Sequence, residues 1–374
     1  YPCFCSAERL AELRARQREA GRPPRYDGRC AGLDGAEAAA RLAAGEPAVL
    51  RLRMPRSGTI AYQDLVRGPQ SVAAAALGDP VIRRADGRVA FLLANALDDA
   101  LMGITHVLRG EDHIANTPRQ LILLQRLGLP APAWGHLGLV VDGAGAPLAK
   151  RRGTASIADL RAAGYRPEAL LNYLARLGNP VADTQLQAAC DLASGFDPAA
   201  LSRSPARFDT DQLDRWQSLA MAAAPAGALL SALEPGRVPA GREADLLALV
   251  QPNLGSAAEL NDWAERLFGT GDVLVSGTPA PIEMAGGGFF ETLAEHLEAA
   301  DTSDWQRLRP ALEAATGRRG GALMKPLRLA LTGLAHGPAL GAIIDLMPPA
   351  IRRRRLDRAA ALAAAGAEPD ASDP

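Results

Sequence analysis

Three consecutive cations, Lys150, Arg151 and Arg152, form the group in this chain that is best suited to chemistry. They follow a glycine-rich stretch at 142–146, and Gly153 comes directly after them. Cations on a glycine-flanked loop can close over an oligophosphate and stabilise the charge that develops on its oxygens in a transition state. A solvated surface turn explains the same cluster, because charged clusters usually form exposed faces. The flanking residues are needed to decide between these interpretations.

Motifs on both sides of the cluster favour the phosphate-binding interpretation. Upstream, the chain reads Asp-Asp-Ala-Leu-Met-Gly-Ile-Thr-His-Val-Leu-Arg-Gly-Glu-Asp-His over 98–113 and Asn-Thr-Pro-Arg-Gln over 116–120. Downstream, it reads Arg-Pro-Glu-Ala-Leu-Leu-Asn-Tyr-Leu-Ala-Arg-Leu-Gly over 166–178 and Ser-Pro-Ala-Arg-Phe-Asp over 204–209. In this order and at these spacings, the motifs closely resemble bacterial glutamyl-tRNA synthetase, a class I aminoacyl-tRNA synthetase. Residues 147–151 then resemble that family's Lys-Leu-Ser-Lys-Arg signature, the second ATP-binding motif of class I enzymes.

The resemblance implies an α/β fold followed by an all-α region. The family's first ATP motif, of the His-Ile-Gly-His type, has no match in the sequence. We therefore expect only the second half of the Rossmann-like core, with roughly the first hundred residues of the family's fold lying before Tyr1. The expected parts are a connective, acceptor-binding insertion with a candidate zinc site (1–88), the second half of the catalytic core (89–141), the signature loop and stem-contact subdomain (142–220), and a helical anticodon-binding region (221–374).

Composition agrees with a chain of several domains. A length of 374 residues predicts about two to three domains. The net charge of −1 excludes global basicity, so RNA binding would need local patches. No apolar run is long enough to span a membrane, and the opening Tyr-Pro-Cys-Phe-Cys does not resemble a signal peptide. Four cysteines do not make a disulfide framework, which favours a reduced, cytoplasmic setting.

Three continuous apolar runs, at 89–97, 105–108 and 135–141, are consistent with buried parallel strands. A helix is expected to begin at 116–118, where Asn precedes Thr-Pro, and to run to Gly128. Ligands of such sheets bind beyond the carboxyl ends of the strands. Residues 109–113 are therefore expected at a binding edge.

Arg109 is the residue expected to bind glutamate. A guanidinium can pair with a carboxylate through two hydrogen bonds, and the matching family position does so. The alternative is a structural arginine paired with Asp98 or Asp99. Phe91 falls where many family members have a tyrosine that helps to bind glutamate, so one hydroxyl is missing here. Asn95 lies four residues further on, on the same face of the predicted strand, and is also expected to bind substrate.

The signature loop departs from the family pattern at two positions. Pro147 replaces a lysine and Ala149 replaces a serine, which removes one charge and one hydroxyl. The catalytic cations are expected to be Lys150 and Arg151, with Lys150 making most of the phosphate contact. The family's ATP-contact positions fall on Asp112, the backbone of Val140, Leu148 and Lys150.

Cys3, Cys5 and Cys30 lie where zinc-binding members of the family carry thiolates. Zinc requires four ligands in tetrahedral geometry. A further ligand of some members falls on Gly32, which has no side chain, so Tyr26 is the expected fourth ligand. The alternative is three free cysteines in a site that has lost its metal.

Other residues carry more local expectations. Ser6 and the Ser156-x-x-Asp159 box predict helix starts. Cys190 is expected to be a buried core residue. The arginines at 352–355, with Arg358, could contact RNA backbone, and a solvated helix face explains them equally well.

The resemblance implies ATP-dependent attachment of L-glutamate to a glutamate-accepting tRNA through glutamyl-adenylate. It implies a monomer that uses ATP and Mg²⁺, with Zn²⁺ as a further candidate. One alternative is a non-catalytic tRNA-binding fragment or paralogue. Another is a glutamyl transferase acting on the tRNA for glutamine. The truncated relatives that glutamylate a modified tRNA base lack an anticodon-binding region, and the helical C-terminal half of this chain argues against that reading.

Overall fold

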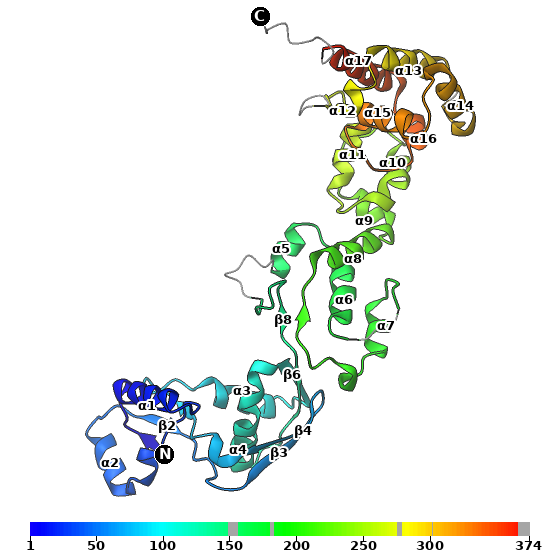
Figure 1. Ribbon diagram of the computed structural model, residues 1–374. Helices are drawn as coiled ribbons and strands as arrows, with labels where there is room; N and C mark the ends of the chain where they lie inside the picture. The colour runs from blue at the N-terminus through cyan, green and yellow to red at the C-terminus, as the bar shows by residue number, and fades with distance from the viewer. Residues whose placement is uncertain (149–155, 180–182, 275–278, 301, 366–374) are drawn as a thin grey trace, which may run out of the picture. The chain divides into compact units, whose positions relative to one another are not determined.

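The computed structural model describes residues 1–148, 156–179, 183–274, 279–300 and 302–365 (Figure 1). The chain forms two compact units. The first comprises Tyr1–Ala149, Ala175–Asp183 and Leu192–Phe208, and the second comprises Lys150–Leu174, Thr184–Asp191 and Asp209–Pro374. Among the described residues, no helix combines the length and the apolar character needed to cross a bilayer.

The first unit carries three small sheets. The N-terminal sheet has the antiparallel order β1-β2-β5, and a four-stranded sheet has the order β4-β3-β7-β6. A two-residue parallel pair, β8 with β9, forms the third sheet. The strands are β1 (Pro2–Cys3), β2 (Val49–Arg51), β3 (Thr59–Asp64), β4 (Gly68–Ala73), β5 (Val81–Arg83), β6 (His106–Gly110), β7 (Ala133–Leu137), β8 (Val140–Val141) and β9 (Ala206–Arg207).

The helices of this unit are α1 (Ala7–Glu19), α2 (Gly35–Ala43), α3 (Phe91–Leu101) and α4 (Thr117–Leu127). As expected, α1 begins at Ser6, whose side chain accepts a hydrogen bond from the backbone of Arg9. Helix α4 begins near Asn116, but the Asn116 side chain makes no capping hydrogen bond. Three-residue to six-residue 3₁₀ turns at Arg29–Gly32, Ala74–Ala76 and Glu111–Asn116 join these elements.

The four-stranded sheet positions the residues expected to bind substrate. Strands β3, β7 and β6 run parallel, and β4 returns antiparallel beside β3. Helices α3 and α4 pack together, and their apolar side chains form a core with Trp134 of β7. The sheet takes strands from both sides of residue 88, because β3 and β4 precede it while β6 and β7 follow it.

The prediction of a strand over 89–97 is wrong. Helix α3 begins at Phe91, and its buried residues Leu92 and Ala96 lie four positions apart on one face. An apolar run does not by itself distinguish a buried strand from a helix, and this run contains leucine and alanine, which favour helices. The predicted strand over 135–141 is also divided, since β7 ends at Leu137 and β8 begins at Val140.

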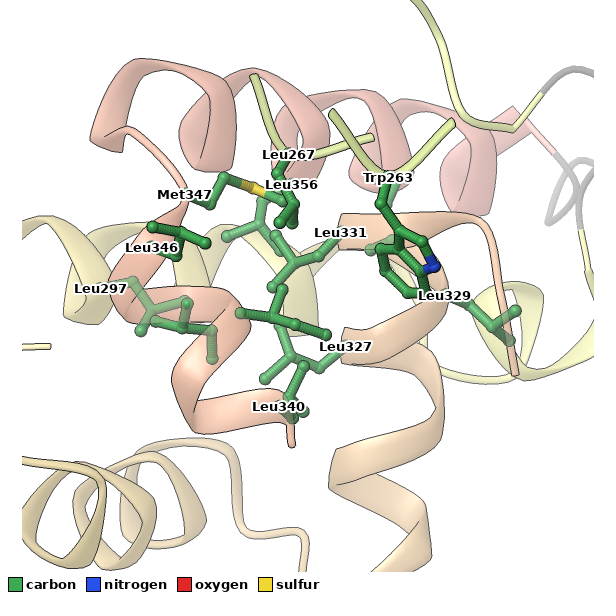
Figure 2. Packing of buried hydrophobic residues seen from close by; sticks show 14 of the residues in the cluster. Trp263, Leu267, Leu297, Leu327, Leu329, Leu331, Leu340, Leu346, Met347 and Leu356 are labelled. Carbon is green, nitrogen blue, oxygen red and sulfur yellow. The ribbon is translucent and has the colours of Figure 1, made fainter. Parts of the chain in front are cut away.

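The second unit has no strand among its described residues, as expected for an all-α region. Its core is a continuous cluster of leucines with aromatic side chains from several helices, part of which Figure 2 shows. Helices α13 and α17 pack against each other in this cluster. Helix α5 begins with the expected capping box, in which Ser156 and Asp159 exchange hydrogen bonds with each other's backbone.

The remaining helices are α5 (Ile157–Ala162), α6 (Pro167–Arg176), α7 (Ala189–Ser194), α8 (Thr210–Ala222), α9 (Ala226–Leu230), α10 (Glu243–Val250), α11 (Glu259–Phe268), α12 (Ala280–Glu283), α13 (Gly287–Ala299), α14 (Trp305–Thr316), α15 (Gly321–Thr332), α16 (Leu340–Leu346) and α17 (Pro349–Ala365). Two further 3₁₀ turns lie at Pro198–Ala200 and Gln251–Asn253.

Gly138 stands at the break between β7 and β8, where two backbone segments approach closely. A Cβ atom at this position would lie 2.2 Å from the backbone oxygen of Ser204. A backbone atom cannot move aside as a side chain can. We therefore expect Gly138→Ala to lower the free energy of unfolding by about 1–3 kcal/mol, measured by urea denaturation. Gly143→Ala is the control, because a Cβ there meets nothing within 4 Å. Equal unfolding midpoints for the two variants would show that this close approach is absent in solution.

Candidate active site

Arg109 lies at the carboxyl end of β6 and is held by neutral side chains. Its Nε–H donates to His136 Nε2 at 3.1 Å. Its Nη2 group donates to Thr117 Oγ1 at 2.7 Å and to Gln120 Oε1 at 2.8 Å. Burial lowers the pKa of Arg109, and the negative charge of Asp99 opposes that shift. No ion pair joins Arg109 to a carboxylate in the described part of the chain, which leaves its charge available to a ligand.

Two residues that sequence analysis did not single out, Asp64 and His136, form a hydrogen-bonded pair next to Arg109. Asp64, at the end of β3, lies with its Oδ2 2.5 Å from His136 Nδ1. His136 belongs to β7, which lies between β3 and β6. Burial raises the pKa of Asp64, but hydrogen bonds from the His136 ring and from the backbone of Arg67 and Val66 outweigh it, so the net shift is downward. Burial also lowers the pKa of His136. The pair is therefore an ionised carboxylate and a neutral imidazole.

Helix α3 brings the other expected substrate residues to the same region. Asn95 Oδ1 accepts a hydrogen bond at 2.8 Å from Gln120, which also accepts one from Arg109. Gln120 thus links Asn95 to Arg109. Phe91 begins α3, and its ring centroid lies 5.8 Å from that of His113. With 59% of its surface exposed, Phe91 is accessible to a ligand.

The residues expected to contact ATP lie around the loops that follow β6 and β8. Asp112 lies in the 3₁₀ turn after β6 and is exposed. A Cβ at Gly110 would lie 2.5 Å from Asp112 Oδ1 and 2.9 Å from Leu139 Cδ2, which places Asp112 next to the residue preceding β8. The backbone N–H of Leu148 donates to the carbonyl of Val140 at 3.1 Å.

A tight turn joins Val140 to Leu148. The Asp142 carboxylate accepts hydrogen bonds from the backbone N–H groups of Ala144 and Ala146, each at 2.9 Å. Val141 then pairs antiparallel with Pro147. The predicted catalytic residues Lys150 and Arg151, together with Ala149, lie outside the described residues.

A cluster of three cysteines forms a separate site in the first unit. The Sγ atoms of Cys3, Cys5 and Cys30 all lie within 4.8 Å of one another. The hydroxyl oxygen of Tyr26 lies 3.3 Å from Cys3 Sγ and 3.7 Å from Cys5 Sγ, and it accepts a hydrogen bond from the Cys30 backbone at 2.8 Å. The structure thus gathers the four side chains named as candidate metal ligands.

Two arginines border this cluster. Arg9 Nη1 lies 3.5 Å from Cys5 Sγ, and the buried Arg51 guanidinium lies 3.8 Å above the Tyr26 ring. Burial raises the pKa of the Cys3 thiol, but hydrogen bonds from Tyr26 and the Cys5 backbone, together with Arg51, outweigh it and lower that pKa to about 7. The site therefore favours the thiolate at Cys3, whereas burial raises the pKa of the Cys5 thiol.

A family model described as "tRNA synthetases class I (E and Q), catalytic domain" matches residues 1–215, more than half of the chain. The chain belongs to the class I (E and Q) tRNA synthetases. A second model, "Anticodon binding domain", matches residues 243–360. The α/β fold followed by a helical anticodon-binding region is thus confirmed.

Several proteins similar in sequence to this chain are named glutamate–tRNA ligase. A glutamate–tRNA ligase 2 of Alkalilimnicola ehrlichii is 48% identical, over 97% of this chain and 77% of the relative. A glutamate–tRNA ligase 1 of Halorhodospira halophila is 46% identical, over 97% of this chain and 76% of the relative. The crystal structure of a glutamate tRNA ligase from Elizabethkingia meningosepticum in complex with its amino acid matches with a TM-score of 0.79 at 24% identity, covering 96% of this chain and 79% of that one. The similarity to this crystal structure shows that the two chains share a fold.

Sequence analysis of this synthetase chain missed four residues around Arg109. They are Asp64, Thr117, Gln120 and His136, all of them buried. A signal for His136 was present, because it is one of five histidines and lies inside an apolar run. A polar side chain in a buried strand needs a hydrogen-bonding partner. That partner could not be named, because Asp64 lies 72 residues away.

Two expectations outside the catalytic region are wrong. Cys190, expected in the core, is exposed in the short helix α7. Arg352 and Arg355, expected to contact RNA or solvent, are both buried, whereas Arg353, Arg354 and Arg358 are exposed, as a solvated helix face requires. Arg355 donates to the carbonyl of Leu331 at 2.6 Å, and Arg352 donates to the carbonyl of Ile344. These carbonyls lie in the last turns of α15 and α16, where helices leave acceptors without partners.

The buried position of Arg355 predicts a structural role for it. Its Nη2 group also reaches the carbonyls of Glu265 and Gly269 at 3.4 Å, and burial lowers its pKa to about 10. Replacing it with methionine removes the donor to the Leu331 carbonyl and the longer contacts to Glu265 and Gly269. We expect Arg355→Met to cost at least about 2 kcal/mol of unfolding free energy, measured by urea denaturation.

The neighbouring Arg354 is exposed, and Arg354→Met is the matched control for the buried arginine. It should unfold like the unsubstituted protein. If Arg355→Met left stability unchanged and weakened tRNA binding instead, the RNA-contact interpretation of this arginine would be restored.

Proposed function

We propose that this chain takes part in attaching L-glutamate to tRNA, as its named relatives do. The α-carboxylate of glutamate attacks the α-phosphorus of ATP, which gives glutamyl-adenylate and releases pyrophosphate. A hydroxyl of the terminal ribose of tRNA then attacks the adenylate carbonyl, which forms the glutamyl ester and releases AMP. This chemistry depends mainly on positioning and on stabilisation of negative charge, so no general base is assigned.

The observation that carries this proposal is the environment of Arg109. Its guanidinium lies at the carboxyl end of a parallel strand, where sheets of this kind bind ligands. Among the described residues, its hydrogen-bond acceptors are His136, Thr117 and Gln120, none of which carries negative charge. A partly buried cation without a carboxylate partner is suited to the side-chain carboxylate of glutamate.

Residues from α3 complete the proposed glutamate pocket. We infer that Asn95 supplies an amide there and that Phe91 supplies an apolar wall. Phe91 lacks the hydroxyl that many family members carry at this position, so the pocket offers one hydrogen bond fewer. The closeness of Asn95 to Arg109, through Gln120, supports this assignment.

ATP is proposed to lie across the loops that follow β6 and β8, next to this pocket. The proposed contacts are Asp112, the backbone of Val140, and Leu148. Lys150 and Arg151 of the signature loop are proposed to stabilise the phosphates during adenylate formation. Magnesium, which accompanies ATP in such reactions, supplies further charge neutralisation when bound.

The proposed partner is a glutamate-accepting tRNA, read by the helical region. The match of residues 243–360 to an anticodon-binding domain supports this proposal. We propose that the protein acts as a monomer in the cytoplasm. A charging assay with purified tRNAs for glutamate and for glutamine would identify the tRNA that is charged.

The cysteine cluster is proposed to hold Zn²⁺ through Cys3, Cys5, Cys30 and Tyr26. Zinc–sulfur bonds of about 2.3 Å in tetrahedral geometry place two sulfurs roughly 3.8 Å apart. The Cys5 and Cys30 sulfurs lie 3.6 Å apart, close to that spacing. Three thiolates and a phenolate exceed the charge of the ion, and the nearby guanidinium of Arg51 offers compensation. Bound zinc would tie the N-terminal strand to the loop at Tyr26 and Cys30 and thus serve the structure.

Arg109→Lys tests the glutamate site. Lysine keeps the charge but loses the two-pronged geometry, so we expect the KM for glutamate to rise about tenfold to a hundredfold in a glutamate- and tRNA-dependent pyrophosphate exchange assay. The control is Arg126→Lys, an exposed arginine of α4, which should not change this KM. Absence of exchange by the unsubstituted protein, with tRNA binding intact, would instead favour the non-catalytic tRNA-binding alternative.

Tyr26→Phe tests the metal site. Loss of one of four ligands should weaken zinc binding at least about tenfold, measured by competition with a chromophoric chelator. Cys190→Ser is the control, because Cys190 is a free cysteine outside the cluster. Elemental analysis showing well under one zinc per chain, with no effect of Tyr26→Phe, would reject the site.

A further inference from the structure

The carboxyl ends of three neighbouring strands place Asp64, His136 and Arg109 in a hydrogen-bonded row. Strands β3, β7 and β6 lie side by side, and Arg109 is directly opposite His136 in the parallel register. Asp64 is 1% exposed and His136 is 0% exposed. Water therefore does not compete for the hydrogen bonds of Asp64 and His136. Thr117 Oγ1 lies 3.0 Å from His136 Nε2 and is a further neighbour of the row.

The direction of each hydrogen bond follows from chemistry. A guanidinium N–H can only donate, so His136 Nε2 must accept from Arg109. A neutral imidazole with Nε2 as acceptor carries its proton on Nδ1, and that N–H donates to Asp64 Oδ2. The second oxygen of Asp64 accepts from the backbone of Val66 and Arg67, each at 2.9 Å. Asp64 is thus held in place and fixes the tautomer of His136.

We propose that Asp64 and His136 are positioning residues that orient the Arg109 guanidinium and thereby set the preference for a carboxylate ligand over an amide. This inference rests on the proposed glutamate-binding role of Arg109. The row anchors the Nε side of the guanidinium, and Thr117 and Gln120 hold its Nη2 group, so that the remaining terminal nitrogen, Nη1, keeps a constant orientation toward the ligand. The one carboxylate in the row touches His136 and not Arg109, so the guanidinium charge is not neutralised by a direct contact.

Selectivity follows from this arrangement. A carboxylate offers only acceptors to the two remaining N–H groups of the guanidinium, those of Nη1, and its charge attracts the cation. The amide of glutamine presents an NH₂ group to the same donors, which leaves an unpaired donor and no charge attraction. Without the contact at Nε, the guanidinium is held only through Nη2, and it can turn so that only the amide oxygen is contacted. Loss of the row should therefore weaken glutamate binding more than glutamine binding.

Substitutions at both residues separate positioning from packing. In Asp64→Asn, the side-chain NH₂ can donate to His136 Nδ1, which moves the imidazole proton to Nε2 and turns it toward the Arg109 N–H. His136→Gln retains an acceptor oxygen near the place of Nε2. His136→Met has a similar length but no acceptor that is comparably strong. The glutamine and methionine variants form a matched pair.

The experiment is calorimetric titration of the full chain with L-glutamate and then with L-glutamine, after a thermal unfolding check of each variant. We expect Asp64→Asn and His136→Met to raise the Kd for glutamate at least about tenfold, while His136→Gln stays within about threefold of the unsubstituted protein. The Kd for glutamine divided by the Kd for glutamate should fall toward one in Asp64→Asn and His136→Met. The same ratio should stay high in His136→Gln.

The outcomes separate this inference from the proposed function. If Arg109→Lys loses glutamate affinity while Asp64→Asn and His136→Met retain it, the positioning role is overturned and the glutamate site stands. If Arg109→Lys binds glutamate as the unsubstituted protein does, the proposed site itself is wrong. If Asp64→Asn fails to fold, the matched pair at position 136 decides, because equal losses in His136→Gln and His136→Met would overturn the inference.

Discussion

A buried guanidinium must have its N–H groups hydrogen-bonded, and this requirement organises the catalytic region of the molecule. The partners of Arg109 come from β7 and α4, and Asn95 of α3 is linked to it through Gln120. Each partner belongs to a strand or a helix whose position is fixed by its own packing. The sheet register sets His136 opposite Arg109, and the first turns of α4 present Thr117 and Gln120. A change in any of these elements alters the orientation of the cation.

The helical unit meets the same requirement differently. Arg352 and Arg355 are more deeply buried than Arg109, and they donate to carbonyls near the C-terminal ends of helices. Those carbonyls would otherwise lack partners, because the last turn of a helix has no following N–H groups. These arginines use their N–H donors for hydrogen bonds within the fold. Arg109, by contrast, has neutral side-chain partners on one side and remains able to pair with a ligand. Burial of an arginine therefore does not by itself indicate a binding site.

The cysteine cluster shows how distant parts of the chain can build a site that local patterns only suggest. Cys3 lies on the short strand β1, and Cys30 lies in a 3₁₀ turn. Tyr26 joins them because its hydroxyl accepts the backbone N–H of Cys30. This hydrogen bond keeps the phenol beside the sulfurs. The positive charge of Arg51 above the ring suits a cluster of anionic ligands.

Motif order and spacing were sufficient to predict the family and the α/β-then-all-α architecture. The residues expected to bind glutamate and ATP stay predictions. Local signals also located the starts of α1 and α5, because a serine that caps a helix acts on the residues next to it. Only the tertiary structure decided that residues 91–101 form a helix, because an apolar run satisfies a buried strand and a buried helix equally. It also decided the burial of Arg355 and the pairing of Asp64 with His136. Those facts depend on strand register and helix packing, which bring together residues far apart in sequence and leave no local trace.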